Sequence, residues 1–250
     1  MLPSVFLDRP FAHRGLHDVT DNRPENSLAS FRAAIALGYG IELDLQISKD
    51  GQAMVFHDYD LQRLAGKPGA ICQQTADELW QTHLLGGGEG IPTLQQVLEL
   101  VDGQVPMLVE IKDQDLRLGT GIGALEEATA QVLNGYSGAV AVMSFNPHST
   151  ARMAELVPDI PRGLVTCNFD KDDWLLVPDA RRDELSRIPD YQRTGSCFVS
   201  HQQNQLDSPA VARLKADGAS VFCWTIRSHE QESKAREVAD NVTFEGYLPT

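Results

Sequence analysis

Hydrophobic and polar residues recur with two different periods, which are found in alternating segments of the chain. Residues 41–47 alternate apolar and polar side chains, a period of two that is typical of a β-strand. Residues 28–37 and 94–101 instead repeat apolar side chains at helical spacing. Gly38 ends the first of these predicted helices, and Thr93 is a candidate N-cap of the second. Strand-then-helix units of this kind favour an α/β fold.

Eight segments qualify as parallel strands: 10–15, 41–47, 107–112, 139–145, 162–166, 197–202, 220–226 and 242–247. Residues 53–57 follow the turn signal Lys49-Asp50-Gly51 and are interpreted as the second arm of a β-hairpin. Because the chain has 250 residues and no dinucleotide-binding glycine pattern, the repeated units predict a (β/α)8 TIM barrel, a single domain over residues 1–250. Residues 59–91 are expected to form a small insertion after the hairpin, and residues 168–193 an irregular segment with one helix.

Composition and charge narrow the possible partners. With 42% hydrophobic residues the chain can bury a full core, and its formal net charge of −14 argues against a nucleic-acid groove. The four cysteines are widely spaced, so free and mostly buried thiols are expected. The N-terminus lacks a signal-peptide pattern, and no apolar run approaches the roughly 18 residues of a membrane span. We therefore expect a cytoplasmic protein without stable membrane insertion.

Polar and titratable side chains stand at the ends of the predicted strands. His13 ends the first strand, Glu42 and Asp44 share one face of the second, and Glu110 ends the third. The hairpin returns His57 to the same end. In a closed barrel these ends meet at one mouth, where α/β barrels keep their chemistry. Taken singly, each residue also has a structural explanation, because alternate carboxylates are typical of a solvated strand face.

The combination points to metal-assisted cleavage of a phosphodiester. Three carboxylates that meet would repel one another unless a divalent cation were bound, and an all-oxygen ligand set suits Mg²⁺ or Ca²⁺. Two histidines beside such a site suit general acid–base catalysis near neutral pH. Arg14 and Lys112 add the positive charge that an anionic substrate needs.

The chain resembles the glycerophosphodiester phosphodiesterase family. The matching motifs follow the family's order along nearly the whole chain: Phe11-Ala12-His13-Arg14-Gly15, Pro24-Glu25-Asn26-Ser27, Glu42-Leu43-Asp44, Lys49-Asp50-Gly51, His57-Asp58, Pro92-Thr93-Leu94, Glu110-Ile111-Lys112, Ser144-Phe145-Asn146 and Trp224-Thr225. The joint pattern is highly specific. The resemblance implies a phosphatidylinositol-phospholipase-C-like TIM barrel that hydrolyses glycerophosphodiesters to sn-glycerol 3-phosphate and an alcohol.

The resemblance also implies roles for particular residues. It assigns one divalent cation, Mg²⁺ or Ca²⁺, to Glu42, Asp44 and Glu110, and the acid–base pair to His13 and His57. Arg14 and Lys112 would contact the phosphate of a small-molecule substrate, and Trp224 would line the side of the leaving alcohol.

One departure and two alternatives stay open. Family members often end with Thr-Asp-x-Pro, where this chain has Glu245 within a longer segment, and no role is carried onto it. A lysophospholipase-D-type substrate would require an exposed apolar rim, for which Leu84, Leu85 and Ile91 are the candidates. A catalytically silent barrel that binds phosphodiesters is the other alternative. Sequence leaves open the headgroup, the metal, the nucleophile (water or a substrate hydroxyl), the oligomeric state and the role of residues 168–193.

Overall fold

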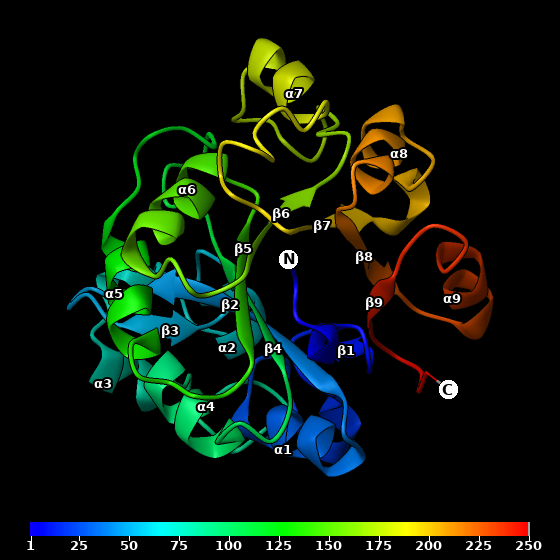
Figure 1. Ribbon diagram of the computed structural model, residues 1–250. Helices are drawn as coiled ribbons and strands as arrows, with labels where there is room; N and C mark the ends of the chain where they lie inside the picture. Colours follow the sequence, from blue (N-terminus) through cyan, green and yellow to red (C-terminus); the bar gives the residue numbers. More distant parts are fainter. Residues whose placement is uncertain (250) are drawn as a thin grey trace.

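The computed structural model of the protein describes residues 1–249 and contains one nine-stranded sheet. The strands are β1 (Phe11–Ala12), β2 (Gly40–Ile47), β3 (Ala53–Val55), β4 (Met107–Ile111), β5 (Val140–Ser144), β6 (Arg162–Thr166), β7 (Phe198–Gln202), β8 (Ser220–Ile226) and β9 (Asn241–Phe244). Eight strands run parallel, and β1 pairs with both β2 and β9, so the ring closes (Figure 1). The predicted (β/α)8 barrel is confirmed.

Helices surround the ring on its outer side (Figure 1). They are α1 (Leu28–Leu37), α2 (Gln62–Ala65), α3 (Ala76–Trp80), α4 (Leu94–Val101), α5 (Ala124–Leu133), α6 (Pro147–Leu156), α7 (Asp179–Leu185), α8 (Pro209–Ala216) and α9 (His229–Ala235), with short 3-10 turns η1 (Ser4–Phe6), η2 (Val19–Asp21), η3 (Ile71–Gln73) and η4 (Gln203–Gln205). Among residues 1–249, no helix is both long enough and apolar enough to span a membrane.

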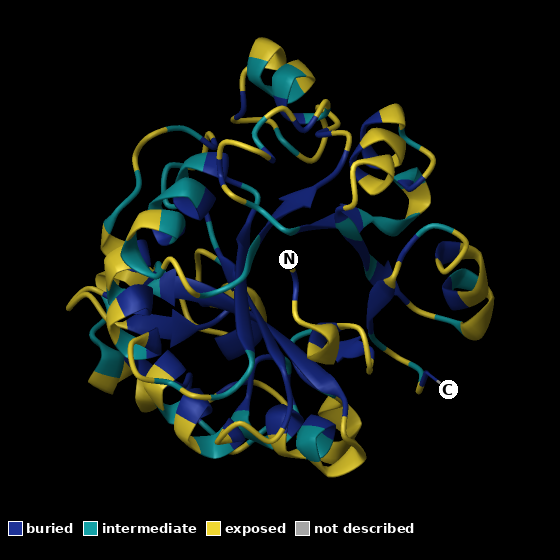
Figure 2. Cartoon of the chain, in the orientation of Figure 1, coloured by how far each residue is buried: buried dark blue, intermediate teal, exposed yellow. Residues whose placement is uncertain are grey.

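Alternation along each strand divides the core into two layers. Outward-facing residues such as Ile41 and Leu43 pack beneath the helices, while their neighbours Glu42 and Asp44 face the inside of the barrel. Figure 2 shows the resulting buried strands inside helices whose outer faces are exposed. Glu42 and Asp44 are only 2% and 1% exposed. The solvated-face interpretation of this strand is therefore wrong, because the polar face of β2 lies inside a closed ring.

Phenylalanine rings fill the bottom of the barrel. Phe11 and Phe198 belong to an inner apolar cluster, which Phe6 of the N-terminal segment joins from below. Glycine makes room for these rings: a Cβ on Gly40 would lie 2.6 Å from the Phe11 ring, and one on Gly163 would lie 2.4 Å from the Phe198 ring. Since the bottom is packed, the space for a ligand is confined to the opposite end.

The first strand is shorter than predicted, because the chain leaves the sheet after Ala12. Arg14 and Gly15 both adopt positive φ angles, of 56° and 79°, and turn the backbone out of the strand direction. The Gly15 amide still donates to the carbonyl of Glu42 on β2 (3.3 Å). This turn, which follows a two-residue strand, holds His13 and Arg14 at the rim of the barrel.

The predicted β-hairpin is confirmed, since β3 pairs antiparallel with β2. Residues 59–91 follow it and carry their own apolar cluster. Leu84 and Ile91 lie in that cluster and are 2% and 0% exposed, so two of the three candidates for an exposed apolar rim are wrong. Only Leu85 of the three faces solvent.

All four cysteines are free thiols, as expected. Cys167 and Cys223 are buried and Cys197 is half-buried, but Cys72 is exposed on η3, so the expectation of buried thiols holds for only part of the set.

Candidate active site

A cavity of about 630 Å³ opens at the carboxyl ends of the barrel strands. We refer to it as the central cavity. It is lined by residues from all eight barrel strands or from the loops that follow them. The lining includes seven of the eight site residues predicted from sequence, all but Asp44: His13, Arg14, Glu42, His57, Glu110, Lys112 and Trp224.

Three carboxylates meet at one wall of the central cavity. Glu42 and Asp44 come from β2 and Glu110 from the neighbouring strand β4, where Asp44 and Glu110 are direct register partners. One carboxylate oxygen of each lies within 4.8 Å of the others. Burial, together with the negative charge of Asp44 and Glu110, raises the pKa of Glu42 well above its ordinary value. Full ionisation of all three carboxylates is therefore unfavourable unless positive charge lies close to them.

Lys112 and Arg14 partly neutralise this cluster. The Lys112 ammonium lies 2.7 Å from an Asp44 oxygen and 2.6 Å from a Glu110 oxygen. Burial opposes ionisation of Asp44, yet Lys112, His57 and Arg14 hold the pKa of its carboxyl well below the ordinary value. Asn26 fixes the same carboxylate by donating its amide N–H at 2.9 Å.

The cluster fits a divalent cation on the chemistry of its donors. Carboxylate oxygens from Glu42, Asp44 and Glu110 are the ligand type that Mg²⁺ and Ca²⁺ prefer. A positive group already lies against two of the three carboxylates in the form of the Lys112 ammonium. The arrangement can thus hold one cation at the edge of the central cavity, beside Arg14.

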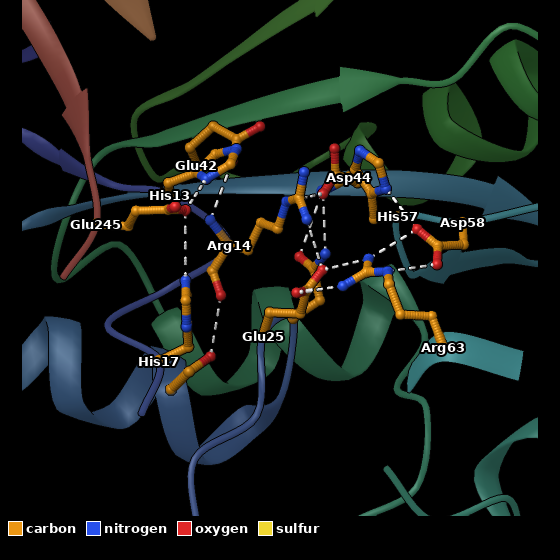
Figure 3. A network of polar contacts seen from close by, with 12 residues as sticks. His13, Arg14, His17, Glu25, Glu42, Asp44, His57, Asp58, Arg63 and Glu245 are labelled. Atoms are coloured by element: carbon orange, nitrogen blue, oxygen red, sulfur yellow. Dashed lines mark hydrogen bonds and ion pairs between the residues drawn. The ribbon is translucent and has the colours of Figure 1, made fainter. Parts of the chain in front are cut away.

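His13 is held by a residue from the far end of the chain. Its Nδ1 donates to Glu245 Oε2 at 2.6 Å, and the same oxygen lies 3.7 Å from His17 Nε2 (Figure 3). The other oxygen of this carboxylate accepts a hydrogen bond from Arg227 at 2.7 Å. Burial lowers the pKa of His13 below its ordinary value, while the hydrogen bond to Glu245 acts in the opposite direction. Since Nδ1 is engaged, Nε2 is the nitrogen that remains for proton transfer.

His57 is held by a chain of ion pairs that also reaches Arg14 (Figure 3). Asp58 accepts from His57 Nδ1 at 2.7 Å and from Arg63 at 2.7 Å. Arg63 in turn contacts Glu25 at 2.8 Å, and Glu25 accepts from Arg14 at 2.7 Å. Burial opposes the charge of Arg14, but Asp44 and Glu25 keep its pKa above the ordinary value. One network therefore orients an imidazole and a guanidinium at the same mouth.

Sequence reasoning missed several of these partners. The sequence motif that contains Glu25 and Asn26 does not predict their contacts with Arg14 and Asp44, and the sequence predicts no role for Glu245. No sequence motif or periodicity points to Arg63, because it lies in the irregular insertion. Ser144, from the motif Ser144-Phe145-Asn146, is buried, donates to the carbonyl of Ile111 at 2.7 Å and does not line the central cavity.

Another part of the cavity wall is aromatic. Phe145 packs against Trp224 with ring centroids 5.6 Å apart and against Trp174 at 4.9 Å. Trp224 lines the central cavity, and its indole N–H donates to the carbonyl of Ser200 at 3.0 Å. The Ser200 hydroxyl is buried, lines the cavity and has no hydrogen-bond partner among residues 1–249.

Comparison with known proteins places this geometry in one family. The model of the glycerophosphoryl diester phosphodiesterase family matches residues 13–241. A glycerophosphodiester phosphodiesterase of Caldanaerobacter subterraneus subsp. tengcongensis is 30% identical over 243 residues, which cover 92% of this chain and 91% of that protein.

Solved structures agree. An Oleispira antarctica phosphodiesterase, solved in complex with the product sn-glycerol-3-phosphate, superposes with a TM-score of 0.76 at 25% identity, covering 96% of this chain and 93% of that one. A glycerophosphodiester phosphodiesterase from Parabacteroides distasonis has the same fold, with a TM-score of 0.73 at 24% identity over 94% of this chain and 91% of its own.

Proposed function

Because the chain belongs to the glycerophosphoryl diester phosphodiesterase family, we propose that it hydrolyses glycerophosphodiesters to sn-glycerol 3-phosphate and an alcohol. The observation that carries the proposal is that two anchored imidazoles, His13 and His57, lie at the same mouth as three buried carboxylates. A silent phosphodiester-binding barrel is not favoured, because it would need neither imidazole to be held by a carboxylate.

The carboxylates of Glu42, Asp44 and Glu110 would hold one divalent cation. When bound, such a cation polarises a phosphoryl oxygen and lowers the pKa of an attacking hydroxyl. Arg14, on the same side of the cavity, offsets negative charge that grows on the phosphoryl oxygens. Lys112 offsets part of the negative charge of the cluster, since its ammonium contacts two of the three carboxylates.

The two histidines would divide the proton transfers. One Nε2 removes a proton from the nucleophile, and the other donates a proton to the oxygen of the leaving alcohol. Support for this division is that each Nδ1 already donates to a carboxylate, Glu245 for His13 and Asp58 for His57. Glu245 and Asp58 are therefore positioning residues, which fix the orientation of each ring and stabilise its protonated form.

A direct assay tests this function. Purified protein is supplied with glycerophosphoethanolamine and Mg²⁺ or Ca²⁺, and release of sn-glycerol 3-phosphate is followed with and without a chelator. We expect activity that the chelator removes. His13→Ala and His57→Ala should each lower kcat by about 10²–10⁴-fold. His83→Ala is the matched control, because His83 is exposed and does not line the central cavity. Near-normal turnover in either variant would overturn the assignment.

A further inference from the structure

The guanidinium of Arg63 lies between two carboxylates, those of Asp58 and Glu25 (Figure 3). Its Nε and Nη2 each donate to Asp58 at 2.7 Å, and its Nη1 and Nη2 donate to Glu25 at 2.8 and 3.0 Å. Both contacts are bidentate, a geometry that a planar guanidinium forms with carboxylates and that the compact ammonium of a lysine cannot reproduce. These hydrogen bonds fix the two carboxylates relative to each other.

Each of the two carboxylates also holds one residue of the central cavity. Asp58 accepts from His57 at 2.7 Å, and Glu25 accepts from Arg14 at 2.7 Å. Burial opposes ionisation of Glu25, yet the hydrogen bond from Arg63 and the charge of Arg14 keep the pKa of its carboxyl below the ordinary value. Arg63 does not itself line the central cavity. Its contacts thus reach the site through Asp58 and Glu25.

The insertion after the hairpin supplies Arg63 and fixes its place. Arg63 lies on α2, and Leu61 and Leu64 on either side of it are 2% and 8% exposed within the apolar cluster of the insertion. The carbonyl of Leu64 also accepts the backbone N–H of Leu85 at 2.8 Å, which ties α2 to a later part of the insertion. The Arg63 side chain is 49% exposed, but its backbone belongs to a packed unit.

The insertion also packs against the segment that carries Glu25. A Cβ added at Gly87 would lie 2.7 Å from Pro24 Cδ, so the backbone of the insertion approaches this segment closely. Glu89 accepts the backbone N–H of Ala29 at 2.8 Å, near the start of α1. The insertion therefore contacts the chain on both sides of Glu25 and pairs with the Glu25 carboxylate as well.

We propose that Arg63 is a positioning residue through which the insertion sets the orientation of both His57 and Arg14. This role rests on the proposed function and extends it to a segment that supplies neither a candidate metal ligand nor a candidate acid–base group. Because one guanidinium holds both carboxylates, its loss disturbs the imidazole that transfers a proton and the guanidinium that contacts the phosphate. The value of kcat should fall through His57, and KM should rise through Arg14.

Steady-state kinetics on glycerophosphoethanolamine measures both constants. Arg63→Ala should lower kcat by about 10–100-fold and raise KM severalfold. Arg63→Lys should recover only part of this loss, because an ammonium cannot form the two bidentate pairs. When Asp58→Asn is already present, Arg63→Ala should cost less in kcat, since its contact with the partner of His57 is already altered. Lys67→Ala is the matched control, because it removes an exposed positive charge from the same insertion, outside the central cavity.

Free guanidinium separates a positioning role from a general loss of stability. Arg63 is half-exposed and borders a second cavity, of about 900 Å³, so a small cation from solution can reach the space that Arg63→Ala leaves. Millimolar guanidinium chloride, far below denaturing concentrations, should raise kcat of Arg63→Ala severalfold, and sodium chloride at the same ionic strength should not. Neither salt should raise the activity of His57→Ala.

Two results would overturn the proposal. One is an Arg63→Ala enzyme with the kcat and KM of the parent, and the other is a loss of activity that free guanidinium does not reverse. If Arg63→Ala does not fold, Arg63→Gln takes its place in both measurements, because it keeps most of the side chain and removes the charge. A parent enzyme that hydrolyses no glycerophosphodiester would instead contradict the proposed function itself.

Discussion

The contacts of Glu245 indicate how the neighbouring His13 ring is held. It accepts from His13 and Arg227, and these bonds hold the pKa of its carboxyl below the ordinary value. A carboxylate that remains ionised can keep the His13 ring in one tautomer throughout the reaction. If His13 transfers protons as proposed, Glu245 influences that step through the orientation of the His13 ring.

We expect Glu245→Gln to lower kcat by about 10–100-fold with little change in KM, because the amide no longer stabilises a protonated His13. Steady-state kinetics on a glycerophosphodiester measures both constants. Glu245→Asp should recover part of kcat, since it keeps the charge. Glu230→Gln on α9, an exposed carboxylate outside the cavity, is the control. A Glu245→Gln enzyme with the kcat of the parent would remove Glu245 from the positioning role.

His201, which does not line the central cavity, should make the stability of the fold depend on pH. Its Nε2 donates to the carbonyl of Gln205 at 3.1 Å, so its Nδ1 accepts from Thr166 at 2.7 Å and the ring is neutral. Burial lowers the pKa of His201 to about 4, from 6.5. The unfolded chain therefore binds this proton first as the pH falls, and stability is lost between pH 6.5 and pH 4.

The expected loss from His201 is about 3 kcal/mol across that window. Urea unfolding of the parent protein and of His201→Gln at several pH values measures it, and the variant should show a flatter profile. His83→Gln, which alters an exposed ring, should keep the parent's profile. If parent and His201→Gln lose stability in parallel, the buried neutral ring is not the cause.

Sequence identifies the candidate site residues better than it identifies their hydrogen-bond partners. Glu42 and Asp44 could be found because a strand's period of two places them on one face. The contact of His13 with Glu245 could not, because it forms only when the first and last strands become neighbours. Trp174 was missed for a related reason, since it lies in a segment without periodicity.

Elements were predicted most reliably where the pattern was long. β2 and α4 match their predicted ranges closely, whereas β1 has two residues because Arg14 and Gly15 turn away from the sheet. The rest of the expected first strand is replaced by that turn. Positive φ angles at a non-glycine residue are not encoded in an apolar pattern, so the boundary could not be predicted.

Close packing between strands β6 and β7 at the bottom of the barrel requires a glycine at position 163. Its added Cβ would lie 2.4 Å from the Phe198 ring on β7, its direct register partner. We expect Gly163→Ala to lower the free energy of unfolding by about 1–3 kcal/mol through overpacking. Urea denaturation measures the change. Gly88→Ala is the matched control, because nothing lies within 4 Å of a Cβ there. An equal effect in both variants would contradict the packing argument.

The folded molecule as a whole should respond to the cation. Binding only to the native carboxylate cluster adds about 2.7 kcal/mol at a cation concentration one hundred times Kd. For a chain of this size that corresponds to a rise in Tm of roughly 5–10 °C. Thermal unfolding with Mg²⁺ or Ca²⁺ and with a chelator measures the rise. Glu110→Gln should abolish it and Glu237→Gln, on the exposed surface, should not. A full rise in Glu110→Gln would exclude Glu110 from the ligands.

Barrel closure has a consequence for how the protein becomes active during its synthesis. A chain leaves the ribosome N-terminus first, and domains fold once enough of them has emerged. The carboxylate cluster is complete in sequence by Glu110, but His13 waits for a partner 232 positions later. The hydrogen bond that orients the His13 ring can therefore form only after Glu245, the residue that follows β9, has been synthesised. If His13 transfers protons as proposed, we expect an unfinished chain that lacks Glu245 to be poorly active.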